Sequence, residues 1–483
     1  MKAKKRTLIA GFFWKMMERI GVQGGQFVLQ IILARLLDAD HYGTLSLMVV
    51  FTNLANVFIQ RGFSSALVQN RDVTEEDYSS VFWITLAVAA VIYAGLWVCA
   101  PLIAVIYKMP DIVAPFRVLT LILFPGAINS IQLAKVKREM DFKKIFYSNV
   151  AGIFCSGVIS IVIAFCGGGL WALVANNLIN TVVACIVMRY TVAWRIRFVC
   201  NLERVKVLFS FGWKLLVSHL INTLYQDIRG LIVGIKYDSG TLGYYNRGKH
   251  FPQFLINTIN NTVQSVMLPA MSAEQDDQNQ LKSMMRKSIS VSAYILFPMM
   301  AGLAAVAEPL ITLLLTEKWL PAVPYMQIYC FSLAFYPVHS CNLQAINAMG
   351  RSDIYLKLEV VKKCYGLGTL AIAVLFFDSP LAIAATGVVT TLISSFVNAF
   401  PNQKLIGYTY IEQLRDILPS LLASLVMCGG VLTVKLLGLN DFVTLVIQIL
   451  VGVVLYVGIS AAAGLEPFKM ILKLLKGFRK KKS

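Results

Sequence analysis

Residues 212–236 read GWKLLVSHLINTLYQDIRGLIVGIK, an apolar segment that also contains Lys214, His219, Asn222, Gln226, Asp227 and Arg229. As a helix this segment is about 37 Å long, enough to cross the ~30 Å hydrocarbon core of a membrane. A charged side chain at the centre of such a helix costs roughly 2.5–3.5 kcal/mol when it faces lipid. We therefore expect a spanning helix whose polar side chains face protein or water.

The composition of the whole chain agrees with this reading. The chain has 483 residues, of which 57% are hydrophobic and 14% are charged, whereas soluble domains have about 25% charged residues. The net charge of +19 fits Lys and Arg that orient membrane spans better than a nucleic-acid partner. The nine cysteines form no CxxC pair and are expected to fill the core. The composition predicts an all-α polytopic membrane protein.

Apolar segments of spanning length can be placed about fourteen times. Their approximate ranges are 14–37, 43–62, 81–106, 113–133, 147–166, 170–190, 212–236, 250–270, 289–315, 323–347, 358–377, 380–401, 413–436 and 441–463. With a cytoplasmic N-terminus, the inner loops contain the basic groups 135–144, 189–206 and 282–287, and the outer loops contain few. This asymmetry predicts an even number of spans with both termini in the cytoplasm.

The chain also contains an internal duplication. Trp14-Lys15 returns as Trp213-Lys214, and the segment 42–45 after Asp38 returns at 242–245 after Asp238. Ser130 and Leu133 return as Ser340 and Leu343, and Gly169-Leu170 returns as Pro380-Leu381, so the offset stays between 199 and 211 residues. We expect an N-lobe over 1–200 with spans one to six, and a C-lobe over 201–405 with spans seven to twelve. Spans thirteen and fourteen follow over 406–465, and 466–483 form a basic cytoplasmic tail. Six spans per copy is an even number, which makes the two copies parallel repeats.

Polar residues form one face on each of the first two spans of both copies. At about 100° per residue, each set falls within an arc of roughly 60–120°, and the set on the seventh span includes Tyr225 as well as Arg229. The candidate cavity residues are Lys15, Arg19, Gln23, Gln26, Asn53, Asn56, Lys214, Asn222, Gln226, Arg229, Asn257 and Asn260. A single amide of this kind can simply join neighbouring helices. Four polar stripes in two matching pairs, three of them with cationic residues, favour a water-filled cavity between two lobes.

Asp227 is a separate question, because it lies about 160° from Arg229 around the helix. It pairs with another span or titrates, so a structural ion pair and an ion-coupling site both stay open. Pro125, Pro298 and Pro337 fall near mid-span and predict kinks. No catalytic group, metal cluster or cofactor motif is found in the sequence.

The stretches FFWKMMERIGVQGGQFVLQIILARLLDADHYGTLSL and FGWKLLVSHLINTLYQDIRGLIVGIKYDSGTLGYYNRG resemble the polysaccharide transporter family. These proteins are Wzx-type oligosaccharide and lipopolysaccharide flippases of the multidrug/oligosaccharidyl-lipid/polysaccharide exporter superfamily. The family pattern falls on Phe211-Gly212, on Asp227 and Gly234, and on Leu242, Gly243 and Tyr245. The resemblance covers nearly the whole chain.

The resemblance implies a flippase that moves an undecaprenyl-diphosphate-linked oligosaccharide from the cytoplasmic to the outer leaflet of the bacterial inner membrane. The expected process is biosynthesis of O-antigen, capsule or exopolysaccharide. The expected partners are the lipid-linked oligosaccharide, membrane lipid, a proton or sodium gradient and the polymerase and export machinery, without nucleic acid. In the superfamily, spans thirteen and fourteen resemble a groove for the lipid tail. An ion-coupled drug or metabolite exporter is the alternative, whereas a membrane enzyme would need a large catalytic outer loop.

Overall fold

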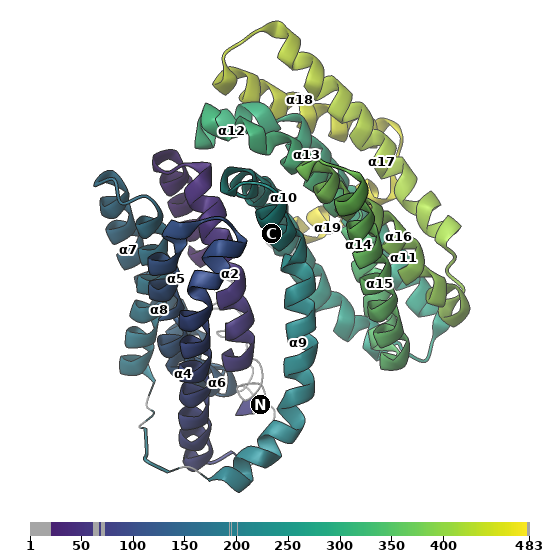
Figure 1. Ribbon diagram of the computed structural model, residues 1–483. Helices are drawn as coiled ribbons and strands as arrows, with labels where there is room; N and C mark the ends of the chain where they lie inside the picture. The colour runs from purple at the N-terminus through teal and green to yellow at the C-terminus, as the bar shows by residue number, and fades with distance from the viewer. Residues whose placement is uncertain are drawn as a thin grey trace. The chain divides into compact units, whose positions relative to one another are not determined.

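The computed structural model describes residues 21–60, 67, 68, 73–192, 194, 196–199 and 201–480, and over these residues all regular secondary structure is helical (Figure 1). Within this part of the chain, nine helical segments are long and apolar enough to cross a membrane. They are Ala39–Gln60, Glu75–Ile106, Pro110–Glu139, Phe142–Phe165, Leu170–Thr191, Gln278–Ala305, Pro380–Ile406, Tyr410–Leu437 and Asp441–Ala462. The predicted all-helical fold is confirmed, and the count of fourteen spans stays a prediction.

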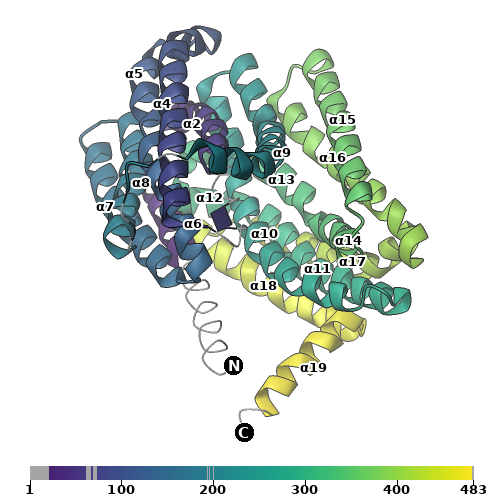
Figure 2. The same cartoon turned by 90° about the horizontal axis from the view of Figure 1, so that it is seen from below.

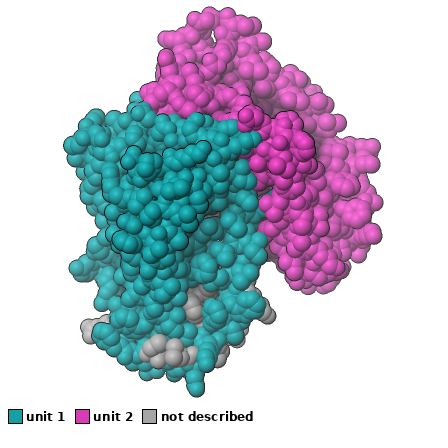
Figure 3. All heavy atoms as spheres, viewed as in Figure 1, with its two compact units in different colours: residues 1–243 teal, residues 244–483 magenta. Residues whose placement is uncertain are grey.

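The chain packs into two compact units, residues 1–243 and residues 244–483, which Figure 3 colours separately. In unit 1 the helical segment 21–36 is followed by α2 (Ala39–Gln60), α4 (Glu75–Ile106), η1 (Pro110–Ile112), α5 (Val113–Thr120), α6 (Leu123–Glu139), α7 (Phe142–Phe165), α8 (Leu170–Thr191) and α9 (Leu202–Lys236). The helix α10 (Ser239–Ala273) begins in unit 1 and continues in unit 2.

Small side chains bring α7 and α8 together, and the two helices lie side by side in both Figure 1 and Figure 2. Every fourth residue of α7 is small and buried: Ser148, Gly152, Ser156, Ser160 and Ala164. A methyl group at Gly152 would lie 2.4 Å from the amide oxygen of Asn180 on α8. Close packing through small residues is how helices associate where lipid supplies no hydrophobic driving force.

Unit 2 continues α10 with helices in the same order as unit 1. They are α11 (Gln278–Ala305), α12 (Ala307–Leu315), η2 (Glu317–Ala322), α13 (Val323–Ala334), α14 (Tyr336–Ala348), α15 (Ser352–Phe376), α16 (Pro380–Ile406), α17 (Tyr410–Thr433), η3 (Val434–Leu437), α18 (Asp441–Ala462) and α19 (Glu466–Lys480). A buried amide network fixes α14, α16 and α17. In this network Asn342 donates to Gln413 at 2.8 Å and Asn402 donates to Asn342 at 2.7 Å.

The predicted kinks at Pro125 and Pro337 are confirmed as helix breaks. The helix α5 ends at Thr120 and α6 restarts at Leu123, while α13 ends at Ala334 and α14 restarts at Tyr336. Each break comes just before a proline, because proline lacks an N–H and its ring clashes with the preceding turn. Pro298, in contrast, lies inside the continuous helix α11.

The element order shows the duplication directly. The helix α10 begins at Ser239, 200 residues after α2 at Ala39, and α16 begins at Pro380, 210 residues after α8 at Leu170. Packing, however, divides the chain after residue 243, so α9 belongs to unit 1. The lobe boundary at 200/201 was placed from the sequence repeat and stays a prediction.

The basic tail forms the helix α19. Phe468 and Ile471 of this helix pack against a buried cluster that includes Tyr294 and Tyr456. The rings of Tyr294 and Phe468 lie 6.5 Å apart between their centroids. The first part of the predicted tail is therefore held against α11 and α18 by apolar contacts.

Candidate substrate-transport site

The stretch at the centre of the sequence argument lies in α9, which has 35 residues. At 1.5 Å per residue this helix is about 52 Å long, well beyond the ~30 Å of a hydrocarbon core. Figure 1 shows α9 extending along the length of unit 1. We call the end that begins at Asn201 the linker end and the end that finishes at Lys236 the motif end.

One end of α9 contacts α4 and the other end contacts Tyr107, the residue directly after α4, and the two contacts are equally spaced on both segments. At the linker end Arg204 pairs with Asp77, and at the motif end Gly234 lies against the ring of Tyr107, where an added methyl group would be 3.2 Å away. The two contacts are thirty residues apart on each helix, which is about 45 Å. The helices α4 and α9 therefore run parallel and meet at both ends.

The middle of α9 is exposed between these two contacts. From Trp213 to Ile232 none of the described side chains is fully buried. Asn222 and Gln226 are exposed, and Arg229 and Asp227 are half-buried. The Arg229 guanidinium lies over the ring of Tyr225, 5.8 Å from its centroid, so these two members of the predicted stripe share one face.

The polar positions of the first copy lie elsewhere in unit 1. Gln26 and Asn53 are exposed, while Gln23 and Asn56 are half-buried. The Asn56 amide oxygen accepts a hydrogen bond from Gln60 at 3.5 Å and lies close to Gly126 of α6. The Asn56 amide is therefore bonded within α2 and faces α6, while Asn53 is exposed.

The structure describes only some of the remaining candidate cavity residues. Asn257 is exposed and belongs to unit 2. Lys15 and Arg19 lie outside the described residues, as do the side chains of Lys214 and Asn260. Among the described positions, the exposed amides are Gln26, Asn53, Asn222, Gln226 and Asn257. An amide at membrane depth is costly in hydrocarbon, so these exposed positions favour contact with water.

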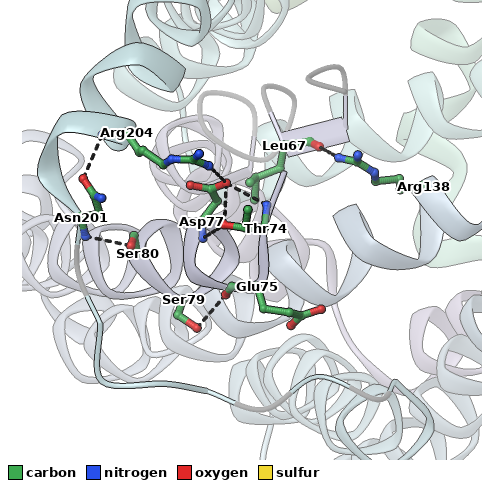
Figure 4. Close-up of polar contacts among 9 residues, drawn as sticks. All are labelled: Leu67, Thr74, Glu75, Asp77, Ser79, Ser80, Arg138, Asn201 and Arg204. Atoms are coloured by element: carbon green, nitrogen blue, oxygen red, sulfur yellow. Dashed lines mark hydrogen bonds and ion pairs between the residues drawn. The ribbon is translucent and has the colours of Figure 1, made fainter. Parts of the chain in front are cut away.

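The sequence did not predict the polar network at the linker end (Figure 4). The Asp77 carboxylate is buried and accepts hydrogen bonds from the Thr74 backbone N–H at 2.8 Å and the Thr74 hydroxyl at 3.0 Å. The Thr74 hydroxyl in turn accepts from the Asp77 backbone, which completes a capping box at the start of α4. The Arg204 Nη1 adds a charge-assisted bond to Asp77 at 2.7 Å.

The described residues between α8 and α9 (192, 194, 196–199 and 201), which we call the repeat linker, lie along the start of α4. Ser80 accepts from the Asn201 N–H at 2.9 Å, and the Trp83 indole donates to the Arg197 carbonyl at 3.0 Å. The Trp194 side chain is 1% exposed and packs edge-on against Phe82, with 5.6 Å between ring centroids. The start of the second copy is thereby held firmly against the first.

An apolar cavity of about 570 Å³ lies in unit 2 between α10, α11, α12, α17 and α18. Its walls include Leu255, Met299, Leu303, Met427, Ile449 and Val453. A cavity of this size suits part of a hydrocarbon chain or a small apolar ligand. Two of its walls come from the helices that follow the duplication.

A family model described as "Polysaccharide biosynthesis protein" matches residues 32–324. The chain belongs to this family. The match begins in the first helix and ends in α13, so it includes both copies of the α2 and α10 motif and all of α9.

Relatives and solved structures agree with this assignment. This family member is 23% identical over 416 residues to the succinoglycan biosynthesis transport protein ExoT of Rhizobium meliloti, which covers 86% of this chain and 82% of that protein. It is 23% identical over 377 residues to the teichuronic acid biosynthesis protein TuaB of Bacillus subtilis, which covers 77% of each. Its fold is similar to the lipid II flippase MurJ in an inward closed conformation, with a TM-score of 0.74, 17% identity and coverage of 94% and 98%. The protein is a multi-pass membrane protein with a transporter fold.

Proposed function

We propose that the protein is a flippase that moves an undecaprenyl-diphosphate-linked oligosaccharide from the cytoplasmic to the outer leaflet of the bacterial inner membrane. The family match over residues 32–324, which covers most of the first copy and the beginning of the second, carries this proposal. The named activities of ExoT and MurJ, a transport protein and a lipid II flippase, support it. The transported unit would serve synthesis of O-antigen, capsule or exopolysaccharide.

The charge of the cavity candidates suits this substrate. A diphosphate is anionic, and Arg229, together with Lys15, Arg19 and Lys214 from the sequence stripes, would supply counter-charges. The half-buried Arg229 lies over Tyr225, so its guanidinium is positioned by an aromatic ring. A guanidinium at this position can supply a charge-assisted hydrogen bond to a phosphate oxygen.

The exposed amides would bind the sugar part. Asn222, Gln226 and Asn53 each offer donors and acceptors that match sugar hydroxyl groups. Because sugars retain much of their hydration, water-mediated contacts can replace direct ones as the oligosaccharide moves. We infer alternating access, in which the polar cavity opens first to the cytoplasm and then to the outside.

The lipid tail would use the apolar cavity of unit 2. Its walls from α11, α17 and α18 are hydrocarbon side chains, so a polyprenyl chain would replace contacts with lipid at little cost. In this proposal both termini are cytoplasmic, no chemical step occurs on the substrate, and a proton or sodium gradient drives the cycle. The polymerase and export machinery of the same pathway would take the product from the outer leaflet.

Deletion of the gene in its native bacterium tests the function. We expect lipid-linked oligosaccharide to accumulate on the cytoplasmic leaflet and the surface polymer to disappear, with both effects reversed by the intact gene. Leaflet position can be measured by the accessibility of the sugar to a lectin or glycosidase in oriented vesicles. Loss of polymer without any accumulation, or accumulation on the outer leaflet, would contradict the proposal.

A further inference from the structure

The second span of each copy begins with a related short motif. The first reads DADHYG over 38–43 and the second reads DSGTLG over 238–243. The aspartates and the final glycines are each 200 residues apart, at Asp38 and Asp238 and at Gly43 and Gly243. These glycines do not belong to the polar stripes, so the proposed cavity gives them no role.

The two motifs pack directly against each other within unit 1. A methyl group at Gly43 would lie 1.7 Å from the carbonyl oxygen of Ser239, and a methyl group at Gly243 would lie 2.0 Å from the carbonyl oxygen of Ala39. Ala39 and Ser239 are themselves 200 residues apart. The contact is therefore reciprocal, as at an interface between two symmetry-related copies. We call it the glycine contact.

Only glycine fits at these two positions. The obstructing atoms belong to the backbone, which cannot move aside as a flexible side chain would. Such an approach allows Cα–H groups to meet carbonyl oxygens, each contact being weak. The Ser239 hydroxyl adds one hydrogen bond to the Asp40 carboxylate at 2.6 Å. The glycine contact thus depends on fit, with little side-chain interlocking.

The position of the glycine contact points to its role. It lies beside the motif end of α9, where Leu242 approaches Gly234. The repeat linker and the basic segment that contains Lys135, both in unit 1, lie at the start of α4, which meets the other end of α9. By the sequence asymmetry, the linker end is cytoplasmic and the motif end is outside. The glycine contact therefore closes the two copies against each other on the outer side.

We propose that Gly43 and Gly243 form the outer closing contact of the transport cycle. They hold α2 against the first turn of α10 while the cavity is open to the cytoplasm, and they separate to release substrate outward. The role in a cycle rests on the proposed flippase function, whereas the glycine contact itself does not.

Disulfide trapping tests both parts. Cysteines at Asp40→Cys and Ser239→Cys replace the two hydrogen-bonded side chains, and mass spectrometry of the linked peptides measures their cross-linking in membranes. We expect ready cross-linking, and we expect Gly43→Ala or Gly243→Ala to slow it roughly tenfold or more, as overpacking a close contact does. The control is Gly95→Ala on α4, where an added methyl group meets no atom within 4 Å. An unchanged cross-linking rate in the glycine variants would overturn the glycine contact.

The same cysteine pair, with both glycines retained, tests the closing role without a folding risk. We expect export of lipid-linked oligosaccharide to stop on oxidation and to return on reduction, with each single-cysteine variant unaffected. Full export by the cross-linked protein would overturn the closing role. The cross-linking result does not depend on the substrate. A gene deletion without oligosaccharide accumulation, together with intact cross-linking, would therefore reject the flippase function and leave the glycine contact standing.

Discussion

The two ends of α9 are fixed to unit 1 by different kinds of contact. At the linker end the buried Asp77 carboxylate and the enclosed Trp194 ring interlock with neighbouring segments. At the motif end Gly43 and Gly243 place backbone against backbone, with the Ser239–Asp40 hydrogen bond beside them.

This difference separates an anchor from a moving contact. Opening the linker end would expose a tryptophan and leave a carboxylate without its partners, at a cost of several kcal/mol. Opening the motif end separates two stretches of backbone and breaks the Ser239–Asp40 hydrogen bond. We therefore expect the linker end to stay closed throughout the cycle, while the motif end opens and the exposed middle of α9 meets the substrate.

The largest expected effect comes from Trp194→Ala at the linker end. Because the ring is 1% exposed, removing it should lower the free energy of unfolding by about 3–5 kcal/mol. Thermal unfolding of the purified protein in detergent measures the loss. The matched control is Trp213→Ala on α9, whose ring is 44% exposed and should matter little. Equal losses of stability in the two variants would contradict the distinction between an anchored linker end and an exposed middle of α9.

Asp77→Ala should come next, with a loss of about 2–4 kcal/mol, since it removes both the capping box and the bond to Arg204. The melting temperature and the amount of protein in the membrane report this effect. Glu76→Ala is the control, because Glu76 is exposed in the same helical turn. If combining Asp77→Ala with Arg204→Ala adds a full second loss, the two residues do not act as a pair.

Arg229→Ala tests the middle of α9. We expect about a tenfold lower export rate at unchanged stability, because a charge-assisted contact to the diphosphate is lost. The same loss is expected for Lys214→Ala. The control Lys236→Ala removes an exposed cation at the motif end of the same helix. Export at the parent rate in both Arg229→Ala and Lys214→Ala would exclude phosphate binding by this face.

Asp227→Asn has the smallest expected effect on stability and separates two roles. As a structural ion pair, the half-buried Asp227 would contribute about 1 kcal/mol or less, and its loss would leave the dependence of export on the proton or sodium gradient unchanged. As a coupling site, the same change would alter that dependence and leave the melting temperature unchanged. Export measured with each gradient collapsed in turn identifies the role.

Several features of the fold could be predicted from local sequence. Pro125 and Pro337 broke their helices because the ring and the missing N–H act within one turn. The stripe containing Tyr225 and Arg229 followed from the 100° step of a helix. The duplication could be recognised in the sequence because both copies contain related short motifs in the same order.

The partners of the linker end were not predictable in the same way. Asp77 and Arg204 are 127 residues apart, and no local rule selects one arginine among many. The polar face of α2 shows the same limit of prediction from sequence. The Asn56 amide lies against Gln60 and α6, whereas the Asn53 side chain is exposed. A stripe gives a direction around one helix axis, and only the neighbouring helices decide what lies in that direction.

The sequence by itself determined a duplicated, helical membrane protein with polar faces, because hydropathy, charge asymmetry and helical period act along the chain. Only the tertiary structure decided that α9 packs with unit 1, that its two ends are held differently, and that Gly43 meets Ser239. Those facts depend on distances between segments that lie far apart in the chain. The sequence shows that a residue is glycine, whereas the backbone packed against it shows why no larger residue fits at that position.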